Sequence, residues 1–101
     1  MKVTTTVMKQ RSVIAVDGDF SFDSVMAFRK DAEALVKAPA VEHIVVDFER
    51  TTYIDSSALG ILLVLRDQCS KAGKTLVLAK LPGSVRQVLS IAKFDKLFVM
   101  E

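Results

Sequence analysis

The residues whose side chains could do chemistry are concentrated in the segment 55–60, which reads Asp-Ser-Ser-Ala-Leu-Gly. Aspartate and serine commonly cap helix N-termini, and a helical pattern of apolar residues begins here. Three capping-type residues in succession exceed what one cap uses. A hydroxyl is therefore left over beside the N–H groups and the dipole of a helix N-terminus, which favour an anion. The segment predicts a helix start with a free hydroxyl that can carry a phosphate.

The first turns of the helix expected over 57–72 are apolar on nearly every side. One stripe can point into the core, and its members are Ala58, Ile61, Leu62 and Leu65. The other apolar positions then lie toward the outside, and they are Leu59, Gly60, Leu63 and Val64. An exposed apolar patch beside a hydroxyl is typical of a docking surface. A phosphate of about −2 charge would disrupt an apolar interface there, which is the physical logic of a switch.

The remaining reactive groups favour neither a catalytic nor a metal site. Ser56 or Ser57 as a nucleophile would need a base, and the only histidine, His43, has no identifiable orienting partner. Cys69 falls on the apolar stripe of the same helix, which predicts a buried thiol. One cysteine and one histidine cannot form a zinc site of the usual kind. We therefore predict no catalytic residue, no metal and no cofactor, and keep a serine-nucleophile enzyme as the third hypothesis.

The composition excludes several classes of protein. With 101 residues, 50% of them hydrophobic, the chain fits one domain over 1–101 with a genuine core. A net charge of +2 without a basic stripe argues against nucleic-acid binding. The N-terminus lacks the apolar core of a signal peptide, and the longest uncharged apolar run, 56–65, is about half of what a membrane span needs. We expect a cytoplasmic protein without direct membrane insertion.

The elements that must position segment 55–60 alternate between strands and helices. Strands are predicted over 3–7 and 13–16, joined as an antiparallel hairpin by the polar turn 9–11, and the second strand stops at 17–19. Further strands are expected over 44–48, 75–79 and 97–100. The segment 44–48 is rich in β-branched residues, which indicates a strand buried on both faces. Residues 51–54 lead out of it. A first helix is expected to begin at the capping residues 21–24 and to end before Pro39. A second is expected over 57–72, where Gly73 ends it, and a third over 85–92.

This order predicts an α/β fold: a mostly parallel sheet, an antiparallel N-terminal edge strand and three helices packed on the sheet. The apolar stripes of the three helices should pack on that one sheet. They comprise Val25, Phe28, Ala32 and Leu35; Ile61, Leu62 and Leu65; and Val85, Val88 and Leu89.

Two central segments, 45–48 (Val-Val-Asp-Phe) and 53–60 (Tyr-Ile-Asp-Ser-Ser-Ala-Leu-Gly), resemble the signature of STAS domains of the anti-sigma-factor antagonist type. The upstream segment 17–22 is similar to the family's glycine-containing β–α turn, and 80–89 to its last β–α segment. The resemblance runs over nearly the whole chain and in the family's order.

The resemblance implies a phosphorylation switch. In such antagonists a partner kinase of the anti-sigma type phosphorylates the serine that matches Ser57, which releases the partner, and a metal-dependent Ser/Thr phosphatase restores binding. Asp55 and Ser56 match the supporting residues of the motif. The implied partner contacts are Ser21, Ala58, Leu59, Gly60 and Leu63. The sequence departs from the family at two of them, because the family usually has glycine at the position of Ala58 and often aspartate at that of Ser21.

The resemblance also leaves a second function open. Some STAS proteins are constitutive subunits of a bacterial phospholipid-transport ABC system, held against its nucleotide-binding subunit. The intact Asp-Ser-Ser segment favours the switch. In both cases the domain is a binding module and not an enzyme.

Overall fold

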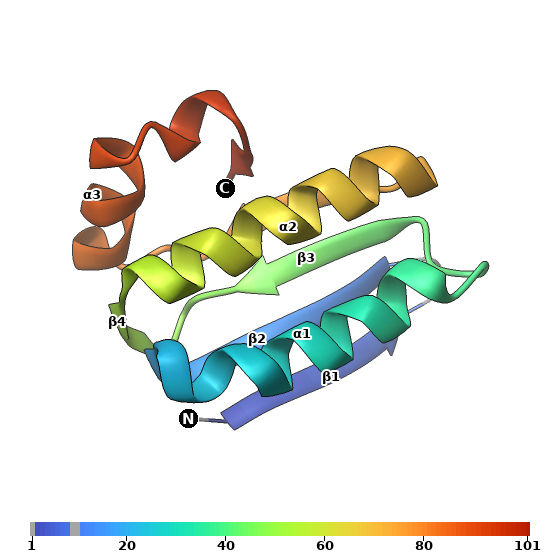
Figure 1. Ribbon diagram of the computed structural model, residues 1–101, viewed down its shortest axis with the longest axis horizontal. Helices are drawn as coiled ribbons and strands as arrows, with labels where there is room; N and C mark the ends of the chain where they lie inside the picture. The colour runs from blue at the N-terminus through green and yellow to red at the C-terminus, as the bar shows by residue number, and fades with distance from the viewer. Residues whose placement is uncertain (1, 9–10) are drawn as a thin grey trace.

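The computed structural model describes residues 2–8 and 11–101 of the chain (Figure 1). Its strands are β1 (Lys2–Met8), β2 (Arg11–Phe20), β3 (His43–Asp47), β4 (Thr51–Ile54), β5 (Thr75–Ala79) and β6 (Val99–Met100). Its helices are α1 (Phe22–Lys37), α2 (Ser56–Ala72) and α3 (Gly83–Ile91), followed by a single 3₁₀ turn at Phe94–Lys96. No helix within the described part of the chain is long and apolar enough to span a membrane.

The sheet has the order β1-β2-β3-β5-β6, and β4 pairs with the end of β2. β1 runs antiparallel to β2, with Val3 opposite Val16, and all the other pairs are parallel. The predicted fold class is thereby confirmed. Residues 9 and 10 of the expected turn lie outside the described residues, but β1 and β2 pair antiparallel, as predicted.

All three helices cover the same face of the sheet. From β2 through β3 and β5 to β6, every crossover advances in the same direction across the sheet. Right-handed crossovers that never reverse direction place their helices on one side. Figure 1 shows α1 and α2 lying together over the strands on the viewer's side. The main core lies between these helices and the sheet.

The core confirms the predicted helical stripes with one exception. A central aromatic group joins Phe20 to Phe28, with ring centroids 4.9 Å apart, and Phe20 to Phe48, at 6.2 Å. The buried stripe residues are Phe28, Ala32, Leu35, Ile61, Leu62, Leu65, Val85 and Leu89, and Val25 is half-buried. Val88, expected in the core, is 36% exposed. The buried side of α3 is centred on Val85 and Leu89, which are four residues apart, and Val88 falls beside it.

Two predicted strand boundaries are wrong. The second strand does not stop at 17–19 but continues to Phe20, because Gly18 adopts a φ of 86° and a bulge follows it. A positive φ costs glycine little, so the strand bends there without ending. β2 pairs with β3 up to Ala15 and with β4 from Gly18 onward. The last strand is shorter than 97–100, because the Leu97 and Phe98 amides donate to Phe94 O and close the 3₁₀ turn.

A lysine from a distant part of the chain closes the C-terminus of α1. Lys74 Nζ donates to Leu35 O (3.2 Å), Ala38 O (2.6 Å) and Val41 O (2.7 Å). The last turn of a helix leaves carbonyl groups without partners, and a cation there also complements the helix dipole. The connection from α1 to β3 is therefore held by the turn between α2 and β5.

Candidate functional site

One carboxylate joins the start of α1 to the start of α2. Asp55 is the N-cap of α2, and its Oδ1 accepts a hydrogen bond from the Ala58 amide at 3.0 Å. Its other oxygen, Oδ2, accepts from the Phe22 amide, the first residue of α1, also at 3.0 Å. Helix N-termini leave amide donors unpaired, and here a single side chain satisfies one from each helix. The supporting role predicted for Asp55 is thus a structural one.

The bulge in β2 makes this junction possible. Beyond Gly18, β2 runs parallel to β4 with Phe20 opposite Ile54, so the two strands end side by side. The buried Thr51 hydroxyl donates to Val16 O at 2.7 Å and fixes the start of β4 against β2. The Asp55 amide then donates to Phe20 O at 3.2 Å. The loops that start α1 and α2 are consequently neighbours although they are more than 30 residues apart.

The predicted partner contact Ser21 has a local structural role. It is the N-cap of α1 and is half-buried. Its amide donates to Ser24 Oγ at 2.9 Å, and that hydroxyl in turn donates to Ser21 O at 2.8 Å. The serines therefore stabilise the β2–α1 turn by satisfying its own backbone groups.

Ser56 and Ser57 both lie in the first turn of α2 and are both exposed. Neither hydroxyl has a hydrogen-bond partner among the residues that the structure describes. Asp55 occupies the cap position of α2, so Ser56 is its first helical residue and does not cap it. Both hydroxyls are therefore available for modification, and exposure alone does not distinguish between them.

The apolar positions around these serines divide between core and surface. Leu63 is 42% exposed, Gly60 is exposed and Leu59 is half-buried against the core, as the helical stripe predicts. Ala58 is different, since its methyl group is fully buried beneath α2. Its predicted position on the inward stripe is confirmed, and its side chain is not accessible to a partner in this structure.

Three exposed apolar residues near the site escaped the sequence reasoning. Phe22 is 66% exposed, Met26 is 71% exposed and Tyr53 is 56% exposed. The signal was present in the spacing, because Phe22 and Met26 are four residues apart and lie off the stripe of Val25 and Phe28. Apolar surface therefore flanks the junction from α1 and β4 as well as from α2.

The other reactive groups lie away from this junction. His43 begins β3, at the opposite end of the sheet from α2's N-terminus, and its Nδ1 lies 2.6 Å from Thr75 Oγ1. Burial raises the pKa of the Cys69 thiol to about 11, against a smaller lowering effect of Lys74. This thiol is therefore neutral near pH 7, as its predicted burial implies. The histidine is not placed to serve as a base for either serine.

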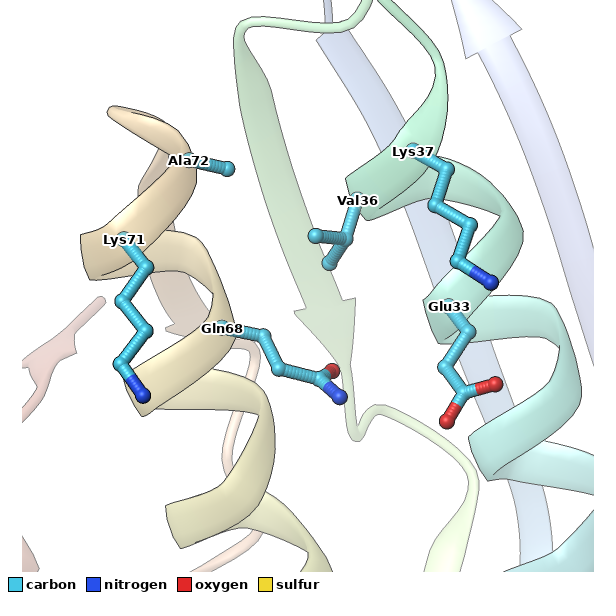
Figure 2. A pocket seen from close by; sticks show the side chains of 6 residues that line it. All are labelled: Glu33, Val36, Lys37, Gln68, Lys71 and Ala72. Atoms are coloured by element: carbon cyan, nitrogen blue, oxygen red, sulfur yellow. The ribbon is translucent and has the colours of Figure 1, made fainter.

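A surface groove of about 490 Å³ separates the C-terminal halves of α1 and α2 (Figure 2). Val36 and Gln68 point toward each other across it, and its other lining residues are Glu33, Lys37, Lys71 and Ala72. It lies at the end of both helices away from Ser57, so it is separate from the junction at their N-termini.

Comparison with known proteins places this geometry in a family. A family model described as "Mlab, STAS domain" matches residues 3–100. The chain is 38% identical over 89 residues to a STAS-domain containing protein of Pseudomonas aeruginosa (strain UCBPP-PA14), across 88% of this chain and 86% of the relative.

Solved structures share the fold at lower identity. The anti-sigma factor antagonist SpoIIAA in its unphosphorylated form is 21% identical, with a TM-score of 0.78 over 99% of this chain and 87% of its own. The phosphorylated form of SpoIIAA, a Bacillus protein, gives a TM-score of 0.77 at 20% identity, over 99% and 91%. A sulfate transporter family protein from Wolinella succinogenes gives 0.81 at 17% identity, over 94% and 80%. The chain therefore belongs to the STAS domain family, whose anti-sigma-factor antagonists its central segments resemble.

Proposed function

We propose that this domain is a phosphorylation-regulated protein-binding module in which Ser57 is the phosphoacceptor. The observation that carries the proposal is an exposed serine hydroxyl at a helix N-terminus, bordered by exposed apolar side chains from two helices. Leu63 follows it on α2, and Phe22 and Met26 rise from the adjoining start of α1. Such a surface suits a protein partner, because exposed apolar patches with polar borders are typical of protein interfaces.

The isolated fold should tolerate a phosphate on Ser57. The group would lie in the first turn of α2, where an anion is favoured by about 0.3–1 kcal/mol. The two SpoIIAA structures support this view, since the phosphorylated and unphosphorylated forms resemble this chain about equally. We expect the same sheet and helices in both states of this protein.

The complex should not tolerate that phosphate. A dianion at Ser57 would be desolvated against the apolar side chains that surround the junction, at a cost that its helix N-terminus offsets only in small part. The Asp55 carboxylate, two residues earlier, would add like-charge repulsion to any acidic partner surface. Phosphorylation therefore opposes binding while leaving the fold intact, as a switch requires.

The partners follow from the resemblance to anti-sigma-factor antagonists. They would be a Ser/Thr kinase of the anti-sigma type, which is both the binding partner and the modifying enzyme, and a metal-dependent Ser/Thr phosphatase that reverses the modification. The domain contributes the substrate serine and the docking surface, and it catalyses neither step.

The test uses three matched variants of the exposed first turn. Ser57→Ala and Ser57→Asp serve as baits in the organism of origin, with Ser56→Ala as the control. A partner should be retained by wild type, Ser57→Ala and Ser56→Ala, and should bind Ser57→Asp at least tenfold more weakly, about 1.4 kcal/mol. Mass spectrometry of the native protein should find the phosphate on Ser57. A phosphate on Ser56 or Thr52 would refute the assignment.

A second candidate function is a constitutive STAS subunit of a transport system, of the phospholipid-transport ABC type. The observation that favours it is the shared fold of the sulfate transporter family protein from Wolinella succinogenes. A constitutive subunit would bind its partner through the same surface without a phosphate. Equal binding by wild type and Ser57→Asp, with no phosphoserine in the native protein, would favour this function over the switch.

A further inference from the structure

The face of the sheet opposite the helices is apolar in the middle of β2, β3, β5 and β6, and part of it is exposed. Val45 and Ala79 are 5% and 7% exposed, yet neither belongs to the core cluster beneath the helices. They point the other way, because side chains alternate along a strand. We define the open face by the residues Val13, Ala15, Val45, Val77, Ala79 and Val99, which share this side in the strand register.

An open face of this kind is unusual for parallel strands. Parallel sheets are normally covered on both faces, and their strands are correspondingly apolar on both sides. β3 has that composition, since Ile44 and Val46 face the helices while Val45 faces away. Val99 on β6 is 60% exposed, and Val13 and Val77 are partly exposed. The exposed part of this face is therefore available to a partner.

The charges on the open face identify the occupant. On β2 the open-face side chains run from Arg11 through Val13 and Ala15 to Asp17. On β3 they run from His43 through Val45 to Asp47 in the same direction. Each strand thus begins with a basic group and ends with a carboxylate, with apolar residues between. This pattern is complementary to itself when a second copy is turned so that its strands run antiparallel.

The acidic end of the open face also contains a cleft. A cleft of about 90 Å³ lies there, lined by Asp17, Asp47, Glu49 and Arg50 together with Ala15 and Val16. Asp47 Oδ2 is 3.9 Å from Lys80 Nζ, and Asp47 Oδ1 accepts a hydrogen bond from the Glu49 amide. The negative charge of Asp47 is therefore partly neutralised. The half-buried Asp17 carboxylate lines the same cleft, where an arginine side chain of a partner can approach it.

We propose that a second copy of this chain packs its open face on this one, about a two-fold axis near Val45. In that arrangement β2 lies over β2 and β3 over β3 with the strands antiparallel. Arg11 of each copy reaches the acidic cleft of the other, and His43 lies over Asp47. Stacked sheets lie about 10 Å apart, which an arginine side chain can span. The interface is isologous, as expected of a closed dimer.

The size of the open face predicts a weak dimer. Four strands at about 4.8 Å spacing and about five residues at 3.3 Å each cover roughly 15 by 17 Å. That is about 250 Å² per copy, below the ~800 Å² of a standard interface, so association should depend on concentration. Ser57 lies on the other, helix-covered side, so both copies keep their switch surfaces accessible. The dimer therefore stands independently of the proposed switch.

The first test measures association by sedimentation equilibrium from micromolar to millimolar concentration. Wild type should show a monomer–dimer equilibrium. Val77→Glu and Val99→Glu should weaken it at least tenfold, because each puts a carboxylate in the middle or at the margin of the apolar face. Both positions are partly or largely exposed, so far-ultraviolet circular dichroism should remain unchanged. Lys71→Ala, on the exposed side of α2, is the matched control and should dimerise like wild type.

The second test addresses the antiparallel geometry. Arg11→Glu and Asp17→Arg should each weaken self-association, since each places like charges together at both ends of a homodimer. An equimolar mixture of the two variants should recover association, because the substituted ends then meet with opposite charge. The proposal is overturned if wild type stays monomeric throughout, which would leave the face to a different protein. It is equally overturned if the mixture associates no better than its components.

Discussion

Asp55 should be sensitive to substitution although it is only half-buried, because its one carboxylate accepts hydrogen bonds from the first turns of two helices. Replacing an N-cap by alanine costs about 0.5–2 kcal/mol for one helix. Asp55→Ala removes acceptors from both the Ala58 and the Phe22 amides, each at 3.0 Å. The expected loss is therefore about 1–4 kcal/mol of unfolding free energy. For a domain of this length, each kcal/mol lowers the melting temperature by about 4–8 °C.

Two further variants separate capping from general effects of charge. Asp55→Asn keeps one acceptor oxygen but turns an NH₂ group toward the other amide, so it should lose about half as much stability. Asp67→Ala removes an aspartate from the same helix whose side chain is 65% exposed and pairs with Lys71. Surface pairs of this kind contribute about 0–1 kcal/mol, so this variant should be nearly neutral.

The assay is urea denaturation followed by circular dichroism, with amide hydrogen exchange as a local readout. Exchange should accelerate at both Phe22 and Ala58 in Asp55→Ala, and in neither amide in Asp67→Ala. A loss in Asp55→Ala no larger than that in Asp67→Ala would show that Asp55 does not cap both helices. The same conclusion follows if only the Ala58 amide responds, since the link to α1 would then contribute nothing.

Further measurements address the surface, the core and the single thiol. Leu63→Glu should change the unfolding free energy by about 0.5 kcal/mol or less and abolish partner binding, whereas Leu62→Ala, one residue earlier and fully buried, should cost about 2–5 kcal/mol; a comparable loss in both would place Leu63 in the core. Ser12→Ala should stabilise the domain by about 1 kcal/mol in urea titrations, because within the described residues its buried hydroxyl has no hydrogen-bond partner; destabilisation would reveal a partner. The pKa of Cys69 is about 11 in the folded state and near 9.0 when unfolded, so the unfolded chain loses the proton first. Stability should therefore fall as pH rises from 9 to 11. Cys69→Ala should remove that part of the pH dependence, and an unchanged profile would show that other groups cause it.

The sequence predicts most of the fold because the elements are locally specified. Helical spacing locates α1 and α2, the β-branched run locates β3, and Gly73 closes α2 in the left-handed conformation, with φ of 71°. The bulge after Gly18 could not be predicted in the same way. A glycine between two aspartates is typical of a turn, and only the pairing of β2 with β4 keeps the strand extended.

The site is predicted in its parts but not in its connections. The capping residues are evident from their types, whereas the bond from Phe22 to Asp55 joins residues 33 apart and depends on how two strands end together. The same limit applies to Ala58, since its small size suits both a partner contact and a core position. Tertiary packing decides between them and places it in the core.

The lysine that closes α1 has a consequence for folding cooperativity. Lys74 holds the carbonyls of residues 33 to 39 positions earlier, so the last turn of α1 is completed only when the α2–β5 turn has docked. Fraying of that helix end and detachment of β5 are thus one event rather than two. The amide protons in the last turn of α1 should therefore exchange only when the α2–β5 turn detaches.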